Sequence, residues 1–219
     1  MIDGLSLSTI PRRTLRERVI ALPQSPFLLA EGSSVRESLD LCRNDVINQT
    51  HDTHCINALK SVHLWDAIQD RGGLASELRA ESLSKGQQQL FCLARAVLRK
   101  RLNDENRSAP GGGVLLLDEF NASVDAETDR LMQEVIKREF AEYTVICAAH
   151  RLESVLDYGR VVVMDKGRIV EIGVIAELKN QTGSRFRELL LIRDDADGSG
   201  SKGEERDDEI SVAGAAQLA

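Results

Sequence analysis

The sequence predicts an α/β fold, because apolar strand patterns and amphipathic helix patterns alternate along the middle of the chain. Residues 114–117 form an uninterrupted apolar run, which is typical of a central parallel strand covered on both faces. Before this run, Leu90, Leu93 and Val97 recur at helical spacing. After it, a helical pattern leads to a second apolar run at Thr144–Ala149. The alternation predicts parallel strands that are connected by helices.

The first half of the chain contains one short predicted strand followed mainly by helices. Val19–Leu22 is an apolar run that ends before a proline, as expected of a strand end. Residues 33–80 contain helical patterns that polar segments interrupt. The amphipathic helix predicted from the periodicity above runs over residues 87–101. The polar stretch 102–113, rich in Gly near its end, predicts a surface loop before the central strand.

The second half predicts a further helix, a hairpin and a final helix. Asp125 is a natural N-cap for a helix whose apolar side chains recur on one face. Two β-branched stretches at residues 160–164 and 168–172 flank an Asp-Lys-Gly turn, which predicts a β-hairpin. A last helical pattern covers residues 184–192. These elements complete a predicted folded domain over residues 1–193.

Residues 194–219 predict an acidic, disordered tail. They contain eight acidic and two basic side chains, so they carry −6 of the formal charge of −7 and leave the remainder at −1. A tail rich in Gly, Ser and acids offers little apolar surface to offset the entropy lost on ordering. The near-neutral body gives no reason to predict nucleic acid as a partner. No apolar run approaches the roughly 20 residues of a membrane span.

Asp118 and Glu119 follow the central strand directly and are the strongest candidates for chemistry. A strand-terminal Asp-Glu pair can simply cap a loop. Two fixed carboxylates can also divide the work of phosphoryl transfer, one holding Mg²⁺ and the next polarising the attacking water. The buried strand before them favours the catalytic interpretation.

The segment Ser84-Lys85-Gly86-Gln87 opens the predicted helix before that strand. A Ser followed three residues later by Gln is the sequence of a capping box. The same turn leaves helix N–H groups free to bind phosphate, and Gly86 allows close approach of the backbone. By itself the segment therefore favours a helix cap, and a phosphate-binding turn stays the alternative.

Two further side chains follow predicted strands. His150 comes directly after Thr144–Ala149. A lone histidine is more often structural, but a neutral imidazole at this position could touch a phosphate and orient a water. Gln24 follows Val19–Leu22, and its amide could bind Mg²⁺ or be an ordinary turn residue. Since parallel strands end at one edge of a sheet, both are expected near Asp118 and Glu119.

Together these motifs occur in the order of the Q-loop, signature, Walker B motif, D-loop and switch histidine of an ATP-binding cassette (ABC). The chain resembles the C-terminal part of an ABC transporter ATPase domain, in particular the second cassette of the C subfamily, the multidrug-resistance-associated type. The resemblance covers residues 2 to about 190. Its motifs stand at Gln24, 83–87, 114–119, 122–125 and 150–152. One departure is Lys85, which occupies the first Gly position of the L-S-G-G-Q signature.

The resemblance implies a partial P-loop NTPase-like fold, with a parallel sheet core and a helical signature subdomain, whose N-terminal part is missing. It implies ATP and Mg²⁺ as cofactors and a second cassette, packed head to tail, as partner. Glu119 and His150 would act on ATP bound by their own cassette, with Asp118 and Gln24 at the metal. The residues expected to contact nucleotide are Gln24, Ser84, Lys85, Gly86, Gln87 and Asp125.

By the same resemblance, ATP hydrolysis would drive transmembrane domains that export a small molecule or conjugate, with the cassette at the cytosolic face of the membrane. The chain contains no G-x-x-x-x-G-K-[ST] phosphate loop. Alone, it is therefore expected to bind ATP poorly and to hydrolyse it negligibly.

Two alternatives remain. The chain could be a catalytically silent cassette fragment that acts as an interaction or dimerisation module. A soluble translation or DNA-repair ATPase is disfavoured, because the sequence has no basic face, no second cassette and no coiled coil.

Overall fold

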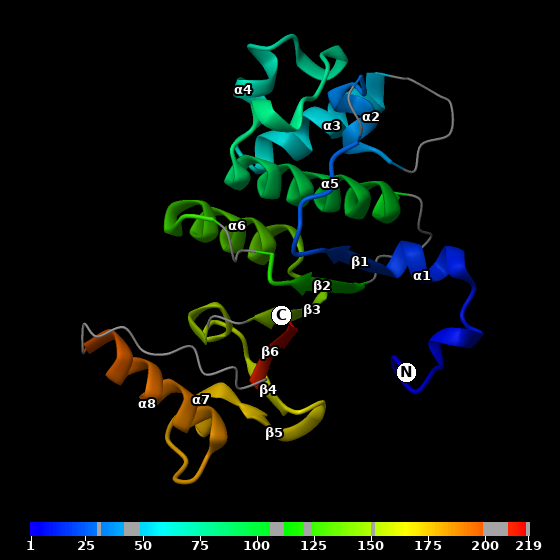
Figure 1. Cartoon of the computed structure of the whole chain (residues 1–219). Coiled ribbons are helices and arrows are strands. Elements are labelled where there is room, and N and C mark those ends of the chain that lie inside the picture. The colour runs from blue at the N-terminus through cyan, green and yellow to red at the C-terminus, as the bar shows by residue number, and fades with distance from the viewer. Residues whose placement is uncertain are drawn as a thin grey trace.

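A six-stranded sheet runs through the molecule in the strand order β1-β2-β3-β6-β4-β5 (Figure 1). The structure is a computed structural model, and it describes residues 1–29, 32–41, 49–105, 112–120, 124–149, 152–198 and 210–217. The strands are β1 (Val19–Leu22), β2 (Val114–Asp118), β3 (Thr144–Ala149), β4 (Arg160–Asp165), β5 (Arg168–Val174) and β6 (Ile210–Gln217). The α/β class predicted from the sequence is confirmed.

The helices account for most of the remaining described chain. They are α1 (Arg12–Arg18), α2 (Val35–Leu39), α3 (Gln49–Ser61), α4 (Trp65–Gln69), α5 (Lys85–Glu105), α6 (Ala126–Glu139), α7 (Ile175–Leu178) and α8 (Arg185–Gly198). Short 3₁₀ helices lie at Leu7–Thr9, Gly73–Ala75, Ala80–Ser82 and Leu152–Val155. The predicted hairpin is confirmed as β4 and β5, and the predicted N-cap of α6 is confirmed at Asp125.

The first three strands of the sheet are parallel. In β1 and β2, Val19 pairs with Val114 and Leu22 with Leu117. In β2 and β3, Asp118 pairs with Ala148. The carboxyl ends of these strands therefore meet at one edge of the sheet, which is where ligands bind in open α/β sheets.

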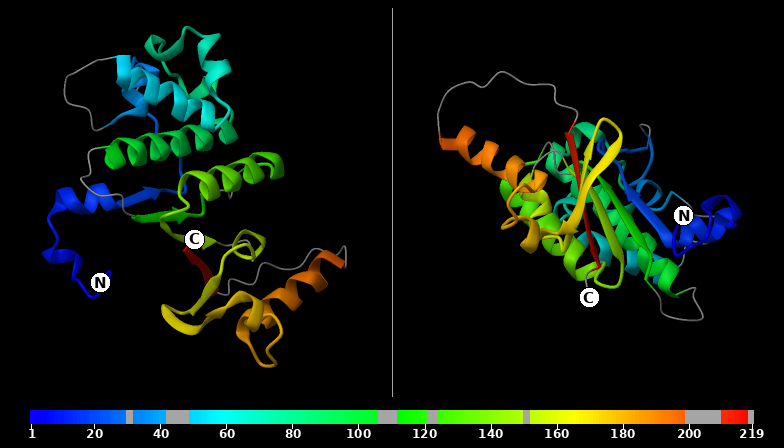
Figure 2. Two further views of the ribbon diagram at one scale, coloured as in Figure 1. Left: turned by 180° about the vertical axis from the view of Figure 1, so that it is seen from behind. Right: turned by 90° about the horizontal axis from the view of Figure 1, so that it is seen from below.

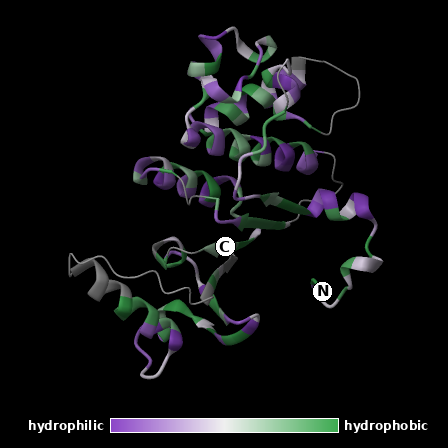
Figure 3. Cartoon of the chain, viewed as in Figure 1, coloured by the Kyte–Doolittle hydropathy of each residue, from purple (hydrophilic) through white to green (hydrophobic). Residues whose placement is uncertain are grey.

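Helix α5 lies between the sheet and the group formed by α2, α3 and α4, with α6 beside it (Figures 1 and 2). The side chains that were predicted to form its apolar face are buried, among them Leu90, Leu93 and Val97. Phe91 is also fully buried, because α5 has neighbours on both sides. Strands β1 and β2 are mainly apolar in colour, whereas the helices alternate between polar and apolar colour along their lengths (Figure 3). One continuous core joins the helices to the sheet.

The prediction that the central strand is covered on both faces is wrong for the described part of the chain. Along β2, buried and exposed side chains alternate, and Leu116 is 37% exposed. Its neighbour in register on β3, Ile146, is 38% exposed. Helices α5 and α6 thus cover one face of β2 and β3, and the opposite face presents apolar side chains.

The C-terminal strand β6 differs from the disorder predicted for the tail. It pairs antiparallel with β3 on one side and with β4 on the other, so it joins two parts of the sheet. Val212 is 5% exposed, and Gly214 lies against Tyr158, whose Cγ would be only 3.0 Å from an added Cβ. The acidic side chains of the tail all lie in residues 194–209. Residues 210–217 are uncharged and pair with β3 and β4. Helix α8 also extends to Gly198, and residues 199–209 lie outside the described chain.

Candidate functional site

Gln24 and Glu119 meet at the carboxyl edge of the parallel strands, although they are 95 positions apart in sequence. The Gln24 Nε2 donates to Glu119 Oε2 at 2.5 Å. Because β1 and β2 are parallel and end together, the residues that follow them emerge side by side. Asp118 is exposed at the end of β2, directly before Glu119. The structure therefore brings the Gln24 amide and the Glu119 carboxylate together, and Asp118 directly precedes Glu119 at the end of β2.

The backbone of Glu119 has an unusual conformation. Its φ is +43°, in the left-handed region that residues other than glycine seldom adopt. Such a conformation costs on the order of 1–3 kcal/mol and persists only where the surroundings fix it. Here the Glu119 N–H donates to the Ala148 carbonyl at 3.0 Å, and Phe120 is fully buried. The turn therefore directs the Glu119 side chain away from the strand and towards Gln24.

The Ser84–Gln87 turn forms the predicted capping box at the start of α5. The Ser84 backbone N–H donates to Gln87 Oε1 at 3.0 Å, and the Gln87 N–H donates to Ser84 Oγ at 3.1 Å. Leu83 is buried and anchors the turn, whereas Ser84 and Lys85 are exposed. The capping prediction is confirmed, and the turn presents its polar side chains to solvent.

Gly86 and Asp125 are linked through Thr128 on α6. A Cβ added to Gly86 would lie 3.3 Å from both Oγ1 and Cγ2 of Thr128, so α5 and α6 approach closely at this glycine. Asp125 accepts from the Thr128 N–H at 2.9 Å and from its hydroxyl at 2.8 Å. The N–H first, and then the hydroxyl, hold the pKa of the Asp125 carboxyl below its ordinary value. The signature turn and the start of α6 are thus in contact.

His150, the remaining predicted site residue, lies outside the described residues. Strand β3 ends at Ala149, at the same edge of the sheet as Asp118. His150 directly follows this strand in the sequence, and its role at the site stays a prediction.

Sequence reasoning did not single out Thr128 or Gln89. Gln89 is 4% exposed, and its Nε2 donates to the backbone carbonyl of Gln24 at 2.8 Å. The available signal was a glutamine that directly precedes the apolar run Leu90–Leu93. For Thr128 the signal was its position three residues after an N-cap aspartate, which makes its N–H and hydroxyl available to the cap.

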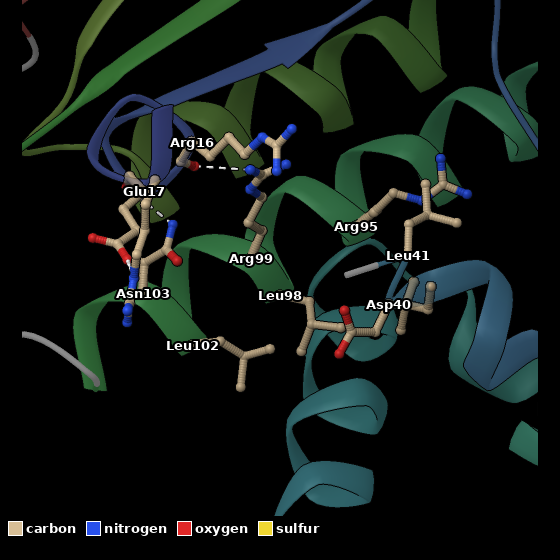
Figure 4. A pocket seen from close by; sticks show the side chains of 11 residues that line it. Arg16, Glu17, Asp40, Leu41, Arg95, Leu98, Arg99, Leu102 and Asn103 are labelled. Carbon is tan, nitrogen blue, oxygen red and sulfur yellow. Dashed lines mark hydrogen bonds and ion pairs between the residues drawn. The ribbon is translucent and has the colours of Figure 1, made fainter. Parts of the chain in front are cut away.

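A separate cavity of about 620 Å³ lies between α1, α5 and the segment after α2 (Figure 4). None of the predicted site residues that the structure describes lines it. Arg99 Nη2 donates to the Arg16 carbonyl at 2.8 Å, and Asn103 Nδ2 donates to the Glu17 carbonyl at 3.0 Å. These hydrogen bonds hold α1 against α5. The residues that line the cavity thus connect two helices, and the cavity is separate from the candidate site.

The oxygen atoms at the sheet edge suit Mg²⁺. Within the described ranges, no group of three or more His, Cys, Asp and Glu side chains is placed to hold a metal ion. Mg²⁺ usually takes one or two carboxylates, waters and substrate phosphates, so it does not need such a group. Asp118 offers a carboxylate, and Gln24, whose NH₂ group faces Glu119, offers its amide oxygen. A carboxylate and an amide oxygen are of the donor types that Mg²⁺ takes.

In the part of the chain that the structure describes, no helix combines the length and apolar character needed to cross a bilayer. No family model matches the chain. Curated relatives do match most of it. An ABC-type transporter, braE, of Annulohypoxylon truncatum is 47% identical over 195 residues, which are 87% of this chain and 13% of that protein.

Two other relatives have the same pattern. An ABC transporter of Gibberella zeae is 45% identical over 190 residues, and ABC multidrug transporter B of Aspergillus fumigatus is 42% identical over 189 residues. Each match covers 86% of this chain and 12% of the relative, so the chain spans about an eighth of the length of these proteins. Over most of its length, therefore, the chain has fungal ABC transporters as homologues, and this similarity supports an ABC transporter domain.

Proposed function

We propose that the chain is the C-terminal part of an ATP-hydrolysing cassette of an ABC exporter, of the second-cassette, C-subfamily type. In the complete protein, ATP hydrolysis would drive export of a small molecule or conjugate. The observation that carries the proposal is the Gln24–Glu119 hydrogen bond beside Asp118 at the carboxyl edge of the parallel strands. A loop cap would not require an amide from the turn after a second strand to meet a carboxylate on a strained backbone.

The residues at this edge divide the chemistry. Asp118 and the amide oxygen of Gln24 would hold Mg²⁺, which when bound neutralises phosphate charge. Glu119 would accept the hydrogen bond of the attacking water and orient it towards the phosphate. His150 would contact the same phosphate from the end of β3. The short contact with Gln24 keeps the Glu119 carboxylate in one orientation.

The signature turn would serve a second cassette. Ser84, Lys85, Gly86 and Gln87 lie at the N-terminus of a 21-residue helix, where N–H groups and the helix dipole favour an anion. In a head-to-tail pair of cassettes, this end would face the nucleotide of the partner. Asp125, which is linked to Gly86 through Thr128, would lie at the same interface.

The ATPase activity belongs to the complete cassette. The chain contains no phosphate-loop motif, which would supply a nest of N–H groups and a lysine to the β- and γ-phosphates. The relatives support the same conclusion, because each is a transporter about eight times longer than the matched segment. Transmembrane domains of the same transporter are the proposed mechanical partners.

The test uses a cassette in which the corresponding upstream segment of the Annulohypoxylon transporter precedes this chain. The expected result is Mg²⁺-dependent ATP hydrolysis, and Glu119→Gln should reduce kcat by about 10²-fold or more, the scale of removing a positioned base. Binding of a fluorescent ATP analogue should be retained, because glutamine keeps the shape of the side chain.

Glu134→Gln is the matched control, since Glu134 is exposed on α6. It should hydrolyse ATP as the unmodified cassette does. Equal turnover in the Glu119→Gln and Glu134→Gln cassettes would refute the role of Glu119. A folded cassette that binds the analogue but hydrolyses no ATP would favour the alternative, a silent interaction module.

A further inference from the structure

Gln89 is a polar side chain inside the core. It lies on the first turns of α5 and is 4% exposed, between the signature turn and the buried Leu90. Its Nε2 donates at 2.8 Å to the Gln24 carbonyl, 65 positions away in sequence. Because a buried amide without a partner is costly, this hydrogen bond fixes both the Gln89 side chain and the Gln24 backbone.

The same face of α5 holds the rest of the segment after β1. Arg95 Nη1 donates to the Phe27 carbonyl at 2.8 Å, and Cys92 Sγ lies 3.9 Å from the same oxygen. Gln89, Cys92 and Arg95 are spaced three residues apart, so they lie along one side of the helix. The segment from Gln24 to Phe27 has no helix or strand of its own, and its carbonyls need such partners.

A continuous set of hydrogen bonds then runs from α5 to the carboxylate. Gln89 holds the backbone of Gln24, and the side chain of Gln24 donates to Glu119. Gln89 is also two residues beyond Gln87, which closes the capping box at the N-terminus of α5. Since an α-helix moves nearly as a rigid rod, a displacement of the signature turn displaces Gln89 with it.

We propose that Gln89 is a positioning residue, which sets the place of Gln24 and thereby couples the N-terminus of α5 to the Glu119 carboxylate. The catalytic consequence rests on the function proposed above. Gln89 touches neither nucleotide nor metal in this scheme. It determines whether the Gln24 NH₂ group reaches Glu119, and so whether that carboxylate is held in one orientation.

The positioning role can be tested on the chain itself by NMR of the Gln24 side-chain NH₂ group, assigned by its loss in Gln24→Ala. A short hydrogen bond to a carboxylate should shift one of its protons downfield. In Gln89→Met, which keeps the size of the side chain but removes the donor, this proton should move upfield. Gln133→Met, on a half-buried site of α6, is the control and should leave it in place.

An unmoved Gln24 signal in folded Gln89→Met would overturn the proposal. If Gln89→Met does not fold, Gln89→Asn is measured in the same way, because its amide is one methylene too short to reach the Gln24 carbonyl. An unmoved signal in that variant would overturn the proposal equally.

The coupling to catalysis is tested in the complete cassette. Gln89→Met should lower kcat by about 10-fold or more, the scale of a misplaced catalytic group, with the KM for ATP unchanged. Unchanged kcat together with a shifted Gln24 signal would overturn the coupling. A shifted Gln24 signal in a cassette that hydrolyses no ATP at all would instead refute the proposed function and leave the positioning role intact.

Discussion

Single residues at the candidate site are held by short-range geometry. Glu119 keeps a left-handed backbone because Phe120 is buried beyond it and its own N–H is bonded to β3. Position 86 favours glycine because an added Cβ would lie only 3.3 Å from Thr128. Asp125 caps α6 through both polar groups of Thr128. Each of these residues has a local physical reason for its type.

At this scale the cap of α6 gives a prediction with a pH dependence. Asp125→Ala should lower the free energy of unfolding at pH 7, and Asp125→Asn should largely retain it, because Asn also caps helices well. The fold lowers the Asp125 pKa, so the ionised cap stabilises the protein above the ordinary carboxyl pKa and loses this effect as pH falls through the lowered value.

Urea unfolding of the three proteins at pH 7 and at pH 3 measures this effect. The difference in the free energy of unfolding between the unmodified chain and Asp125→Ala should be smaller at pH 3 than at pH 7. A difference that is constant or larger at pH 3 would contradict the ionised cap.

Among the elements, β6 connects the parallel strands to the hairpin of β4 and β5. It lies between β3 and β4 and pairs with both along most of its length (Figure 2). Gly214 is opposite Cys147 on β3, and Tyr158 packs on that glycine. Burial is the main cause that raises the Cys147 pKa to about 11, so this thiol is protonated and unreactive at neutral pH.

Removal of β6 should expose this thiol. A chain that ends at Glu209 should react at Cys147 with a thiol reagent at pH 8 at least about 10-fold faster than the full chain, since only an accessible thiolate reacts. Gly214→Val should have a similar effect, because its side chain would collide with Tyr158, whereas Ala213→Val at a half-exposed position should not.

Mass spectrometry of labelled peptides separates Cys147 from Cys55 and Cys92, two other buried thiols. These should remain protected, which would show that the change is local. Equal labelling of Cys147 with and without β6 would mean that the strand does not protect this part of the sheet.

At the scale of the whole molecule, the described helices cover only one face of the parallel strands. Helices α5 and α6 lie on one face of the parallel strands, and Leu116 and Ile146 are side by side and more than a third exposed on the other. Neighbouring exposed apolar side chains on a sheet favour association between molecules.

The chain on its own should therefore bind a hydrophobic dye and associate as its concentration rises. The double variant Leu116→Lys with Ile146→Lys should reduce both effects and keep the far-ultraviolet circular dichroism. Leu191→Lys, at a 53% exposed site on α8, is the control and should change neither effect. Dye binding and light scattering that are equal in the double variant and the control would contradict this assignment of the exposed face.

Local pattern was enough to predict β2, β3 and most of α5, because strand and helix periodicities depend only on near neighbours in sequence. It was also enough to place Gln24 and Glu119 at one edge, since residues that follow parallel strands must emerge together. These parts of the site follow from the sequence by itself.

The tertiary structure alone decided the contacts between distant segments. Nothing near Gln89 in sequence indicates that its amide meets the Gln24 carbonyl, and nothing near Gly214 indicates that it fits beneath Tyr158 between two strands. Composition even predicted disorder for the tail that contains β6. The physical reason is that a hydrogen bond or a close contact depends on both partners, and periodicity in one segment carries no information about which other segment will pack against it.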